Sequence, residues 1–182
     1  MRSRRERMAE LVSAHHADLY RHALWLTGDP ALAEDLVQET YYEAWRSLSR
    51  LGGPRSPRAW LLAILRRRLA RHRAAPAPPT VPVEALAELA AGDDPEAAAE
   101  LEGLARAFAR LPDTQREILL LRALHGLSYR EIAALLDVPL GTVMSRLSRA
   151  RAALLAAGPT EAHAAEVVPF PRRRFPRGGK DG

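Results

Sequence analysis

A chain of 182 residues can form one average domain or two small ones, and it is too short for a large catalytic barrel. Cysteine is absent, which excludes disulfides and thiolate metal sites. Apolar residues make up 47% of the chain and aromatic residues only 5%, because alanine and leucine supply most of the apolar share. This composition favours helices over strands.

The net charge of +5 is unevenly distributed along the chain. Residues 1–75 carry 14 basic and 8 acidic side chains, residues 76–105 carry 7 acidic and no basic ones, and residues 106–157 carry 8 basic and 4 acidic ones. Two basic blocks on either side of an acidic spacer indicate two binding surfaces joined by a linker. A polyanion is the expected partner.

The N-terminal sequence MRSRRERMAELVSAHH is basic but lacks the apolar segment of a signal peptide. No stretch approaches the roughly eighteen consecutive apolar residues of a membrane-spanning helix. We therefore expect a cytoplasmic protein with no membrane insertion.

Three helices are predicted before residue 74. The first covers residues 5–26 and ends at the sequence TGDP. Asp29 can cap the second helix, which has Pro30 at its first position. The expected apolar stripe of this helix consists of Ala33, Leu36, Val37, Thr40, Ala44 and Leu48. The breaker-rich sequence SRLGGPRSP then leads to a third helix at residues 57–73, whose final segment, RRRLARHR, is strongly basic.

The rest of the chain divides into a spacer, a second helical segment and a tail. Residues 75–103 are rich in proline, alanine and acidic side chains, which predicts a flexible linker with one short helix at residues 83–91. Residues 158–182 are rich in proline, glycine and arginine and are expected to be disordered. The predicted fold is all-α, with small helical domains at residues 5–74 and 104–157.

The segment LSYREIAALLDVPLGTVMSRLSRAR, residues 127–151, has the pattern of a helix-turn-helix. It follows Gly126, which suits the C-terminal cap of the preceding helix. Ser128 and Glu131 form the S-x-x-E capping box that begins a helix, and residues 137–141 contain the breakers of a tight turn. A turn this short makes the next helix cross steeply, as in DNA-reading motifs.

The second helix of this segment has two different faces. The apolar face consists of Leu140, Val143, Leu147, Ala150 and Leu154. The outward face carries hydroxyls and guanidiniums, which suit phosphate oxygens and guanine edges in a major groove, and consists of Thr142, Ser145, Arg146 and Arg149. Gly141 would permit close approach of the backbone to a duplex. Periodicity alone leaves open an ordinary surface helix on which arginine only increases solubility.

Two stretches resemble bacterial RNA polymerase sigma factors of the sigma-70 family. The sequence LPDTQREILLLRALHGLSYREIAALLDVPLGTVMSRLSRARAAL resembles region 4, and DPALAEDLVQETYYEAWR followed by RAWLLAILRRRLARHR resembles region 2. These two regions alone, joined by a short linker, are typical of the extracytoplasmic-function (ECF) group. The resemblance implies a protein that binds core RNA polymerase, recognises the minus-thirty-five promoter element and melts the minus-ten element.

The resemblance also assigns roles to particular residues. In the family, the acidic second helix of region 2 docks on the beta-prime clamp helices, which implies polymerase contacts by Asp35, Gln38 and Glu39. A solvated acidic face would explain these residues equally well without the resemblance. Region 4 is expected to meet the beta flap, and an anti-sigma factor is an expected partner. The implied minus-thirty-five contacts are Gly141, Thr142, Ser145, Arg146 and Arg149.

The loop SLSRLGGPRSP and the start of the third helix match the family segment that melts the minus-ten element and holds a flipped base. The implied contacts are Arg55, Arg58, Arg66, Arg67 and Arg71. Each of these arginines could instead be an exposed solubilising charge. Family members often carry asparagine in place of Arg67 and a polar residue in place of Arg71, so this helix is unusually basic. We expect the third helix to pack through Trp60, Leu61, Ile64 and Leu65, and we assign Trp60 to the core in preference to a base-stacking platform.

Two other classes of function are compatible with parts of the sequence. A free-standing helix-turn-helix repressor or activator would need residues 1–75 as a dimerisation domain, whereas their acidic and basic helices suit polymerase and DNA better. An enzyme is disfavoured because metalloprotease, P-loop and dinucleotide motifs are absent, and no cofactor or metal is expected. The histidines of the first helix are expected to be exposed or half-buried: His15, His16 and His22.

Overall fold

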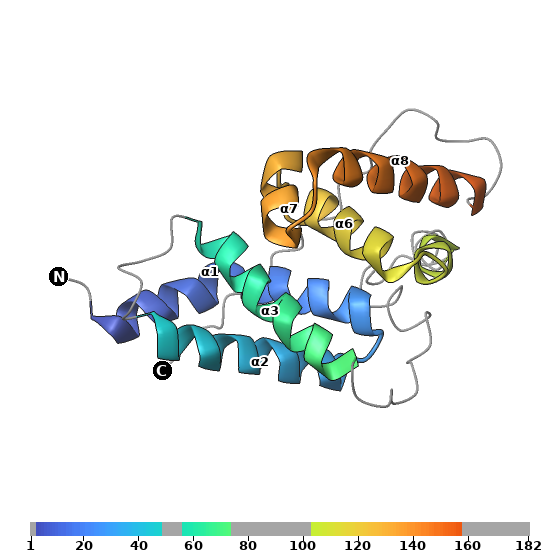
Figure 1. Ribbon diagram of the computed structural model, residues 1–182. Helices are drawn as coiled ribbons and strands as arrows, with labels where there is room; N and C mark the ends of the chain where they lie inside the picture. Colours follow the sequence, from blue (N-terminus) through green and yellow to red (C-terminus); the bar gives the residue numbers. More distant parts are fainter. Residues whose placement is uncertain (1–2, 49–55, 74–102, 158–182) are drawn as a thin grey trace.

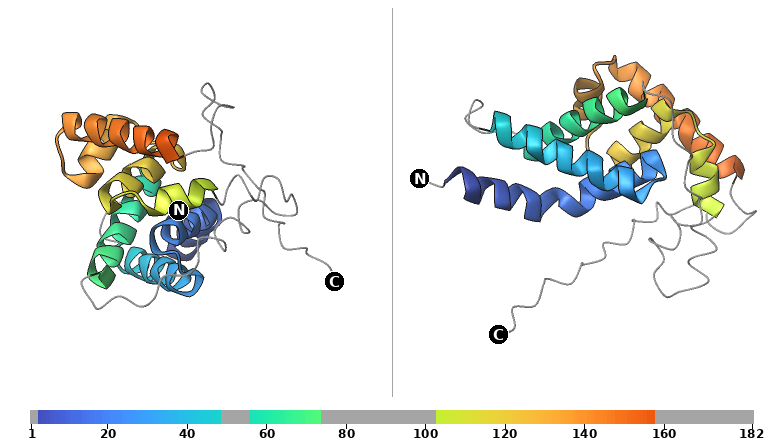
Figure 2. Two further views of the ribbon diagram at one scale, coloured as in Figure 1. Left: turned by 90° about the vertical axis from the view of Figure 1, so that its right-hand side faces the viewer. Right: turned by 90° about the horizontal axis from the view of Figure 1, so that it is seen from below.

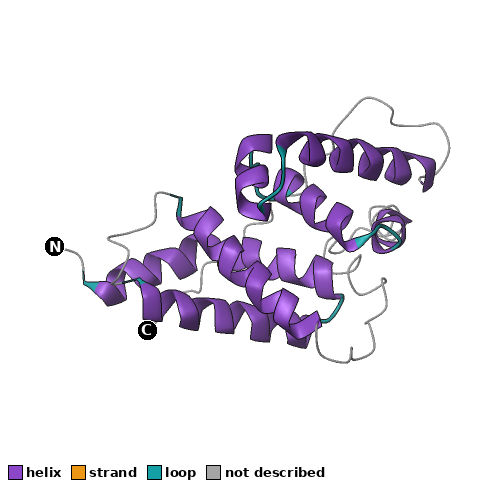
Figure 3. Cartoon of the chain, viewed as in Figure 1, coloured by secondary structure: helices purple, strands orange, loops and turns teal. Residues whose placement is uncertain are grey.

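The structure, a computed structural model, describes residues 3–48, 56–73 and 103–157. All regular secondary structure in these ranges is helical (Figure 3), which confirms the predicted all-α class. Within them, no helix is both long and apolar enough to cross a membrane. The predicted linker helix at residues 83–91 and the C-terminal tail lie outside the described ranges.

Helices α1 (Arg4–Thr27), α2 (Pro30–Ser47) and α3 (Pro57–Arg73) pack together as an N-terminal unit (Figure 1). The three predicted helices are thus confirmed. Between α1 and α2, Gly28 adopts a left-handed conformation with φ of 69°, which glycine accepts at little cost. The Asp29 carboxylate accepts the backbone N–H groups of the first turn of α2, as predicted. These local signals fold α1 and α2 into a helical hairpin.

The predicted apolar stripe of α2 forms much of the core of this unit. Its members are all buried: Ala33, Leu36, Val37, Thr40, Ala44 and Leu48. The Thr40 hydroxyl donates to the Leu36 carbonyl at 2.7 Å, so its burial leaves no hydrogen bond unmade. From α3, Leu61, Ile64 and Leu65 are buried and Trp60 packs half-buried against the core, as expected.

Residues 103–109 are helical and, with α6 (Asp113–Ala123), α7 (Tyr129–Leu136) and α8 (Leu140–Ala157), make a C-terminal unit. Helices α7 and α8 are the predicted helix-turn-helix. Gly126, which follows α6, has a φ of 66°, in agreement with its predicted capping position.

The predicted capping box opens α7. The backbone N–H of Glu131 donates to the Ser128 hydroxyl at 3.2 Å, and the Ser128 N–H donates to the Glu131 carboxylate at 2.7 Å. Asp137 ends α7 in the left-handed conformation, with φ of 53°. The start of α7 is therefore set by the Ser128 and Glu131 side chains and its end by the backbone of Asp137, and together they place α8 across α7.

The apolar face of α8 is only partly as predicted. Val143, Leu147 and Ala150 are buried and Leu154 is half-buried, but Leu140 is 40% exposed. The prediction for Leu140 was wrong because it occupies the first turn of α8 beside the exposed residues of the tight turn, where no helix covers it.

The two units pack against each other on the side of α1 and α3 that is away from α2 (Figures 1 and 2). The rings of Trp25 and Phe108 meet edge to face, with centroids 5.1 Å apart. Residues 22–26, at the C-terminal end of α1, are all buried. Helices α2 and α3 cover one side of this segment, and the C-terminal unit covers the other side. His22 is only 3% exposed, so the expectation of an exposed or half-buried histidine was wrong.

Removal of the capping hydroxyl by Ser128→Ala is expected to lower the free energy of unfolding by about 1 kcal/mol, because α7 loses the acceptor for its first-turn N–H group. Urea denaturation followed by circular dichroism measures this loss. Ser148→Ala, at an exposed position inside α8, is the matched control and should change stability little. Equal effects of the two substitutions would contradict the capping role.

Candidate nucleic-acid interface

The five predicted minus-thirty-five contacts lie together on the first three turns of α8. Gly141, Ser145 and Arg149 are exposed, and Thr142 and Arg146 are half-buried. The buried residues of α8 point to the opposite side, toward the other helices of the C-terminal unit. The helix therefore presents a continuous polar face to solvent.

The polar groups on this face are held close to the helix. The Arg149 guanidinium donates to the Ser145 carbonyl and to the Ser145 hydroxyl, both at 3.3 Å, and that hydroxyl donates to the Thr142 carbonyl at 3.1 Å. A Cβ added at Gly141 would meet no atom within 4 Å, so packing inside the protein does not require glycine there. The space beside Gly141 is open to an incoming ligand.

The predicted minus-ten arginines do not form one surface. Arg67 and Arg71 lie one turn apart on the exposed side of α3, where the Arg67 guanidinium pairs with Glu43 of α2 at 3.1 Å. Arg55 lies outside the described residues.

Arg58 and Arg66 instead point into the contact between the units. Arg58 donates to the backbone carbonyl of His125 at 3.0 Å and pairs with Asp18 of α1 at 3.5 Å. Arg66 pairs with Glu117 of α6 at 3.0 Å. The resemblance assigned all five arginines to one DNA contact. Of the four that the structure describes, two are exposed on α3 and two contact the other unit.

A further ion pair at this contact joins Arg73, the last residue of α3, to Asp113 at 2.9 Å. Sequence reasoning missed Asp113 and Glu117 as partners of the arginines. Asp113 lies in the first turn of α6, where an acidic side chain also fits ordinary helix-dipole stabilisation, and Glu117 follows one turn later. Nothing local could connect them with arginines 40 and 51 positions earlier.

The carboxylates that hold the α3 arginines differ in their electrostatics. Burial alone would raise the pKa of Glu43, but hydrogen bonds and charge from Arg68 and Arg67 hold this pKa below its ordinary value. Burial raises the pKa of Glu117 above its ordinary value, and the charges of Arg66 and Arg73 offset only part of this effect. The folded state therefore favours the charged form of Glu43 and disfavours the charged form of Glu117.

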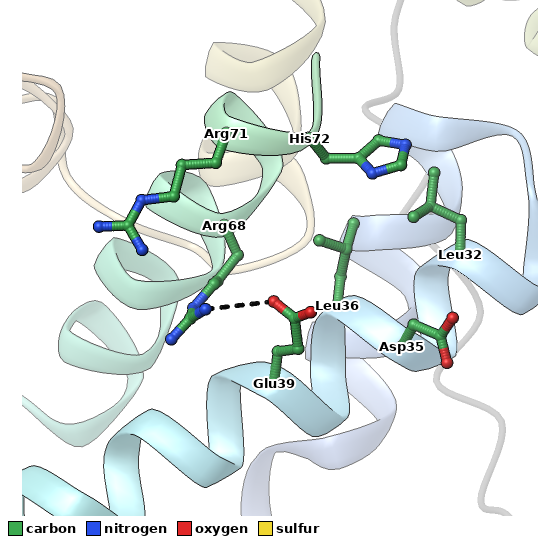
Figure 4. Close-up of a pocket in the computed structure, with 7 residues that line it drawn as sticks. All are labelled: Leu32, Asp35, Leu36, Glu39, Arg68, Arg71 and His72. Carbon is green, nitrogen blue, oxygen red and sulfur yellow. Dashed lines mark hydrogen bonds and ion pairs between the residues drawn. The ribbon is translucent and has the colours of Figure 1, made fainter. Parts of the chain in front are cut away.

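The predicted polymerase contacts Asp35, Gln38 and Glu39 are exposed on α2, on the side away from the C-terminal unit. The Glu39 carboxylate pairs with Arg68 at 3.3 Å. Asp35 and Glu39 line a cleft of about 300 Å³ between α2 and α3, shown in Figure 4. The other lining residues are Leu32, Leu36, Arg68, Arg71 and His72. The α2 side of this cleft carries carboxylates, and the α3 side carries the basic residues Arg68 and Arg71. Such a surface suits a protein partner that carries charges of both signs.

A search of the described residues finds no group of three or more histidine, aspartate or glutamate side chains that could hold a metal ion. The features that stand out in this part of the chain are charged surfaces and the contact between the two units.

Models of two sequence families match the chain. Sigma-70 region 2 matches residues 11–75 and sigma-70 region 4 matches residues 101–154. The first match covers most of α1 and all of α2 and α3, and the second covers the helix-turn-helix.

Curated relatives agree with these matches. A probable RNA polymerase sigma-C factor of Mycobacterium bovis is 38% identical over 148 residues, which cover 80% of this chain and 80% of that protein. The ECF RNA polymerase sigma factor SigL of Mycobacterium tuberculosis is 37% identical over 154 residues, which cover 81% of this chain and 86% of the relative.

Two solved structures have the same overall arrangement. The sigma factor RpoE of Bartonella quintana, determined in complex with the anti-sigma factor NepR, aligns with a TM-score of 0.63 and 25% identity, covering 84% of this chain and 94% of that one. CnrH, determined in complex with the cytosolic domain of CnrY, aligns with a TM-score of 0.61 and 26% identity, covering 84% of this chain and 87% of that one.

The chain belongs to the sigma-70 family of RNA polymerase sigma factors, within its ECF group. Its two helical units are regions 2 and 4 of that family. Sigma factors take part in transcription initiation and are not enzymes.

Replacement of Glu117 by Gln is expected to raise the free energy of unfolding at neutral pH, because its raised pKa means that the folded state favours the neutral form. Glu43→Gln should have the opposite effect, because the lowered pKa of Glu43 stabilises the folded state above the ordinary pKa. The Glu117 difference should shrink as the pH falls through its raised pKa toward about 4.5, and the Glu43 difference should shrink as the pH falls from about 4.5 through its lowered pKa. Denaturation at several pH values measures them, and equal signs at neutral pH would contradict the assignment.

Proposed function

We propose that this sigma factor directs promoter-specific initiation through three separate surfaces. Region 4 reads the minus-thirty-five element, region 2 binds the melted minus-ten element, and the acidic side of α2 docks on the beta-prime clamp helices. The observation that carries the proposal is the continuous polar face of α8, whose hydroxyls and guanidiniums are accessible on the second helix of a helix-turn-helix.

In the minus-thirty-five contact, Gly141, Thr142, Ser145, Arg146 and Arg149 are the proposed DNA-facing residues. The recognition helix of such a motif enters the major groove with the residues near its N-terminus against base edges. Arg149 can exchange its bonds to Ser145 for two parallel bonds to one guanine. The open space above Gly141 supports a close approach of the backbone.

In the minus-ten contact, Arg67 and Arg71 are exposed in this structure. DNA phosphates would replace Glu43 as the partner of Arg67. Arg58 and Arg66 are held by the His125 carbonyl and by Glu117 of the other unit, and they become free for single-stranded DNA when they leave these partners. Arg55 is proposed from the resemblance alone. The full minus-ten surface therefore requires the two units to separate.

The proposed partners are core RNA polymerase, through Asp35, Gln38 and Glu39 and through the beta flap, together with promoter DNA and an anti-sigma factor. Two similar proteins were determined in complex with another protein, which in one of the two complexes is an anti-sigma factor by name. We place the activity in the cytoplasm and the domains at residues 5–74 and 104–157, with residues 75–103 as linker and residues 158–182 as a tail.

Run-off transcription tests the proposal directly. Purified core polymerase with this protein is expected to start transcripts from members of a promoter library, whereas core polymerase alone should not. If no transcript appears and the protein alone binds duplex operators tightly, the sigma function is wrong for this chain and the repressor alternative gains support.

Arg146→Ala combined with Arg149→Ala is expected to weaken minus-thirty-five binding by roughly 10- to 100-fold, because one bidentate arginine contact contributes about 1–3 kcal/mol. Fluorescence anisotropy with a duplex promoter measures this affinity. Arg151→Ala, also exposed on α8 but outside the proposed contact set, is the matched control. Core binding should be unchanged, and its loss would refute the assigned role.

Asp35→Arg is expected to lower the affinity for core polymerase by about tenfold or more, because it reverses a charge at the proposed docking face. Titration of labelled protein with core enzyme measures the effect. Glu10→Arg makes the same charge change on α1 and should leave core affinity nearly unchanged. If both variants bind core equally well, α2 is not the docking helix.

A further inference from the structure

Two histidine rings meet at the centre of the contact between regions 2 and 4. His22 comes from the buried end of α1, and His125 lies between α6 and α7. Their rings lie 4.9 Å apart between centroids, and Nε2 of His125 is 3.0 Å from Nδ1 of His22. Each residue is only 3% exposed. One ring donates and the other accepts, which two neutral imidazoles can do.

The surroundings of this pair are already positively charged. From α3, Arg58 donates to the backbone carbonyl of His125. From α1, Arg21 and His15 also face His125, and their charges disfavour a further positive charge on its ring. The Asp18 carboxylate on α1 is already shared by Arg21 at 2.6 Å and Arg58 at 3.5 Å. Among the described residues, the charged groups that act on the two rings are arginines and histidines, with no carboxylate among them.

The second nitrogen of the His125 ring supports the same conclusion. Its Nδ1 is buried and has no hydrogen-bond partner. A proton added to His125 would therefore create a buried charge, and one of its two N–H groups would have no acceptor. Burial, and then the charges of Arg58, Arg21 and His15, lower the pKa of His125 to about 3. Burial and the neighbouring His125 lower the pKa of His22 well below its ordinary value.

We propose that the His22–His125 contact is a pH-sensitive latch that holds regions 2 and 4 together while both rings are neutral and releases them when either ring is protonated. Release separates Arg58 from the His125 carbonyl and Arg66 from Glu117. The consequence for DNA rests on the function proposed above, in which these two arginines join the minus-ten contact only after the units separate. The latch itself depends on the described contacts alone.

The direction and size of the effect follow from proton linkage. In the open form both rings are exposed and their pKa returns to about 6.5, whereas the closed form excludes the proton. The ratio of closed to open forms is therefore independent of pH well above this value, and it falls as the pH drops below it. Between about pH 7.5 and about pH 5.5, the ratio of closed to open forms is expected to fall by about 100-fold, or about tenfold for each histidine.

One acidic group at the contact acts in the opposite direction. The pKa of Glu117 is raised by burial, so acidification favours the closed form at this position. Its effect begins at the raised pKa of the closed form and is complete near the ordinary pKa of a glutamate, which is about two units below that of histidine. His15 is half-buried beside Arg58 and has a lowered pKa, so it adds a smaller opening effect. Histidine variants are therefore needed to separate these contributions.

Energy transfer between two dyes on the full-length chain tests the latch. The chain has no native cysteine, so Ala9→Cys on α1 and Ala152→Cys on α8, both exposed, give two unique attachment sites. Transfer is expected to be constant above about pH 7 and to fall between about pH 6.5 and pH 5 as the units separate. Far-UV circular dichroism should show that the helices persist. An unchanged distance down to about pH 5 would overturn the latch.

Histidine variants show which side chains cause the pH dependence of the distance between the two units. His22→Gln combined with His125→Gln should reduce the 100-fold pH effect to less than about tenfold, because the two principal titrating rings are gone. His16→Gln, a histidine of the same helix that stacks on Tyr41 instead, should behave as wild type. If the double variant loses helix content, His125→Gln alone is expected to remove about half of the effect on a logarithmic scale.

A double variant with the full wild-type response would also overturn the latch. This assay contains neither polymerase nor DNA, so it separates the two proposals. A failed run-off assay would refute the proposed function without affecting the latch. A distance that does not change with pH would refute the latch without affecting the proposed function.

Discussion

The apolar contact between the end of α1 and the second helical unit is the constraint on which the rest of this structure depends. Trp25 of region 2 packs edge to face on Phe108 of region 4, and residues 22–26 of α1 are buried from both sides. Large apolar side chains at such a contact contribute the dominant favourable term. Once these residues meet, α3 lies against the C-terminal unit, and its arginines face carboxylates that are far away in the sequence.

This packing divides the charged surfaces into open and covered ones. The polar face of α8, the acidic face of α2, and Arg67 and Arg71 of α3 remain accessible. Arg58 and Arg66 are held by the neighbouring unit. While the two units are packed together, the proposed polymerase and minus-thirty-five surfaces of this sigma factor are exposed, but only part of its proposed minus-ten surface is. In the proposed function, separation of the units is a step at which promoter melting can be controlled.

Many features of the fold were predictable because their causes lie within a few residues. The Asp29 cap with Pro30 begins α2, and the Ser128–Glu131 capping box begins α7. The stripe of α2 is buried along its whole length because helical periodicity alone places those residues on one side. The same periodicity correctly placed the polar face of α8, so the five candidate contacts could be chosen before the fold was known.

The sequence by itself thus determined the helices, their caps and the faces that they turn inward, because these depend on interactions across one or two turns. Only the tertiary structure decided that His22 is buried, that Leu140 is exposed and that Arg58 and Arg66 point into a neighbouring unit. Each of these outcomes depends on which distant surface covers a residue or leaves it open. Periodicity shows that a helix has a face, but the pairing of faces is settled by shape, burial and charge across the whole chain.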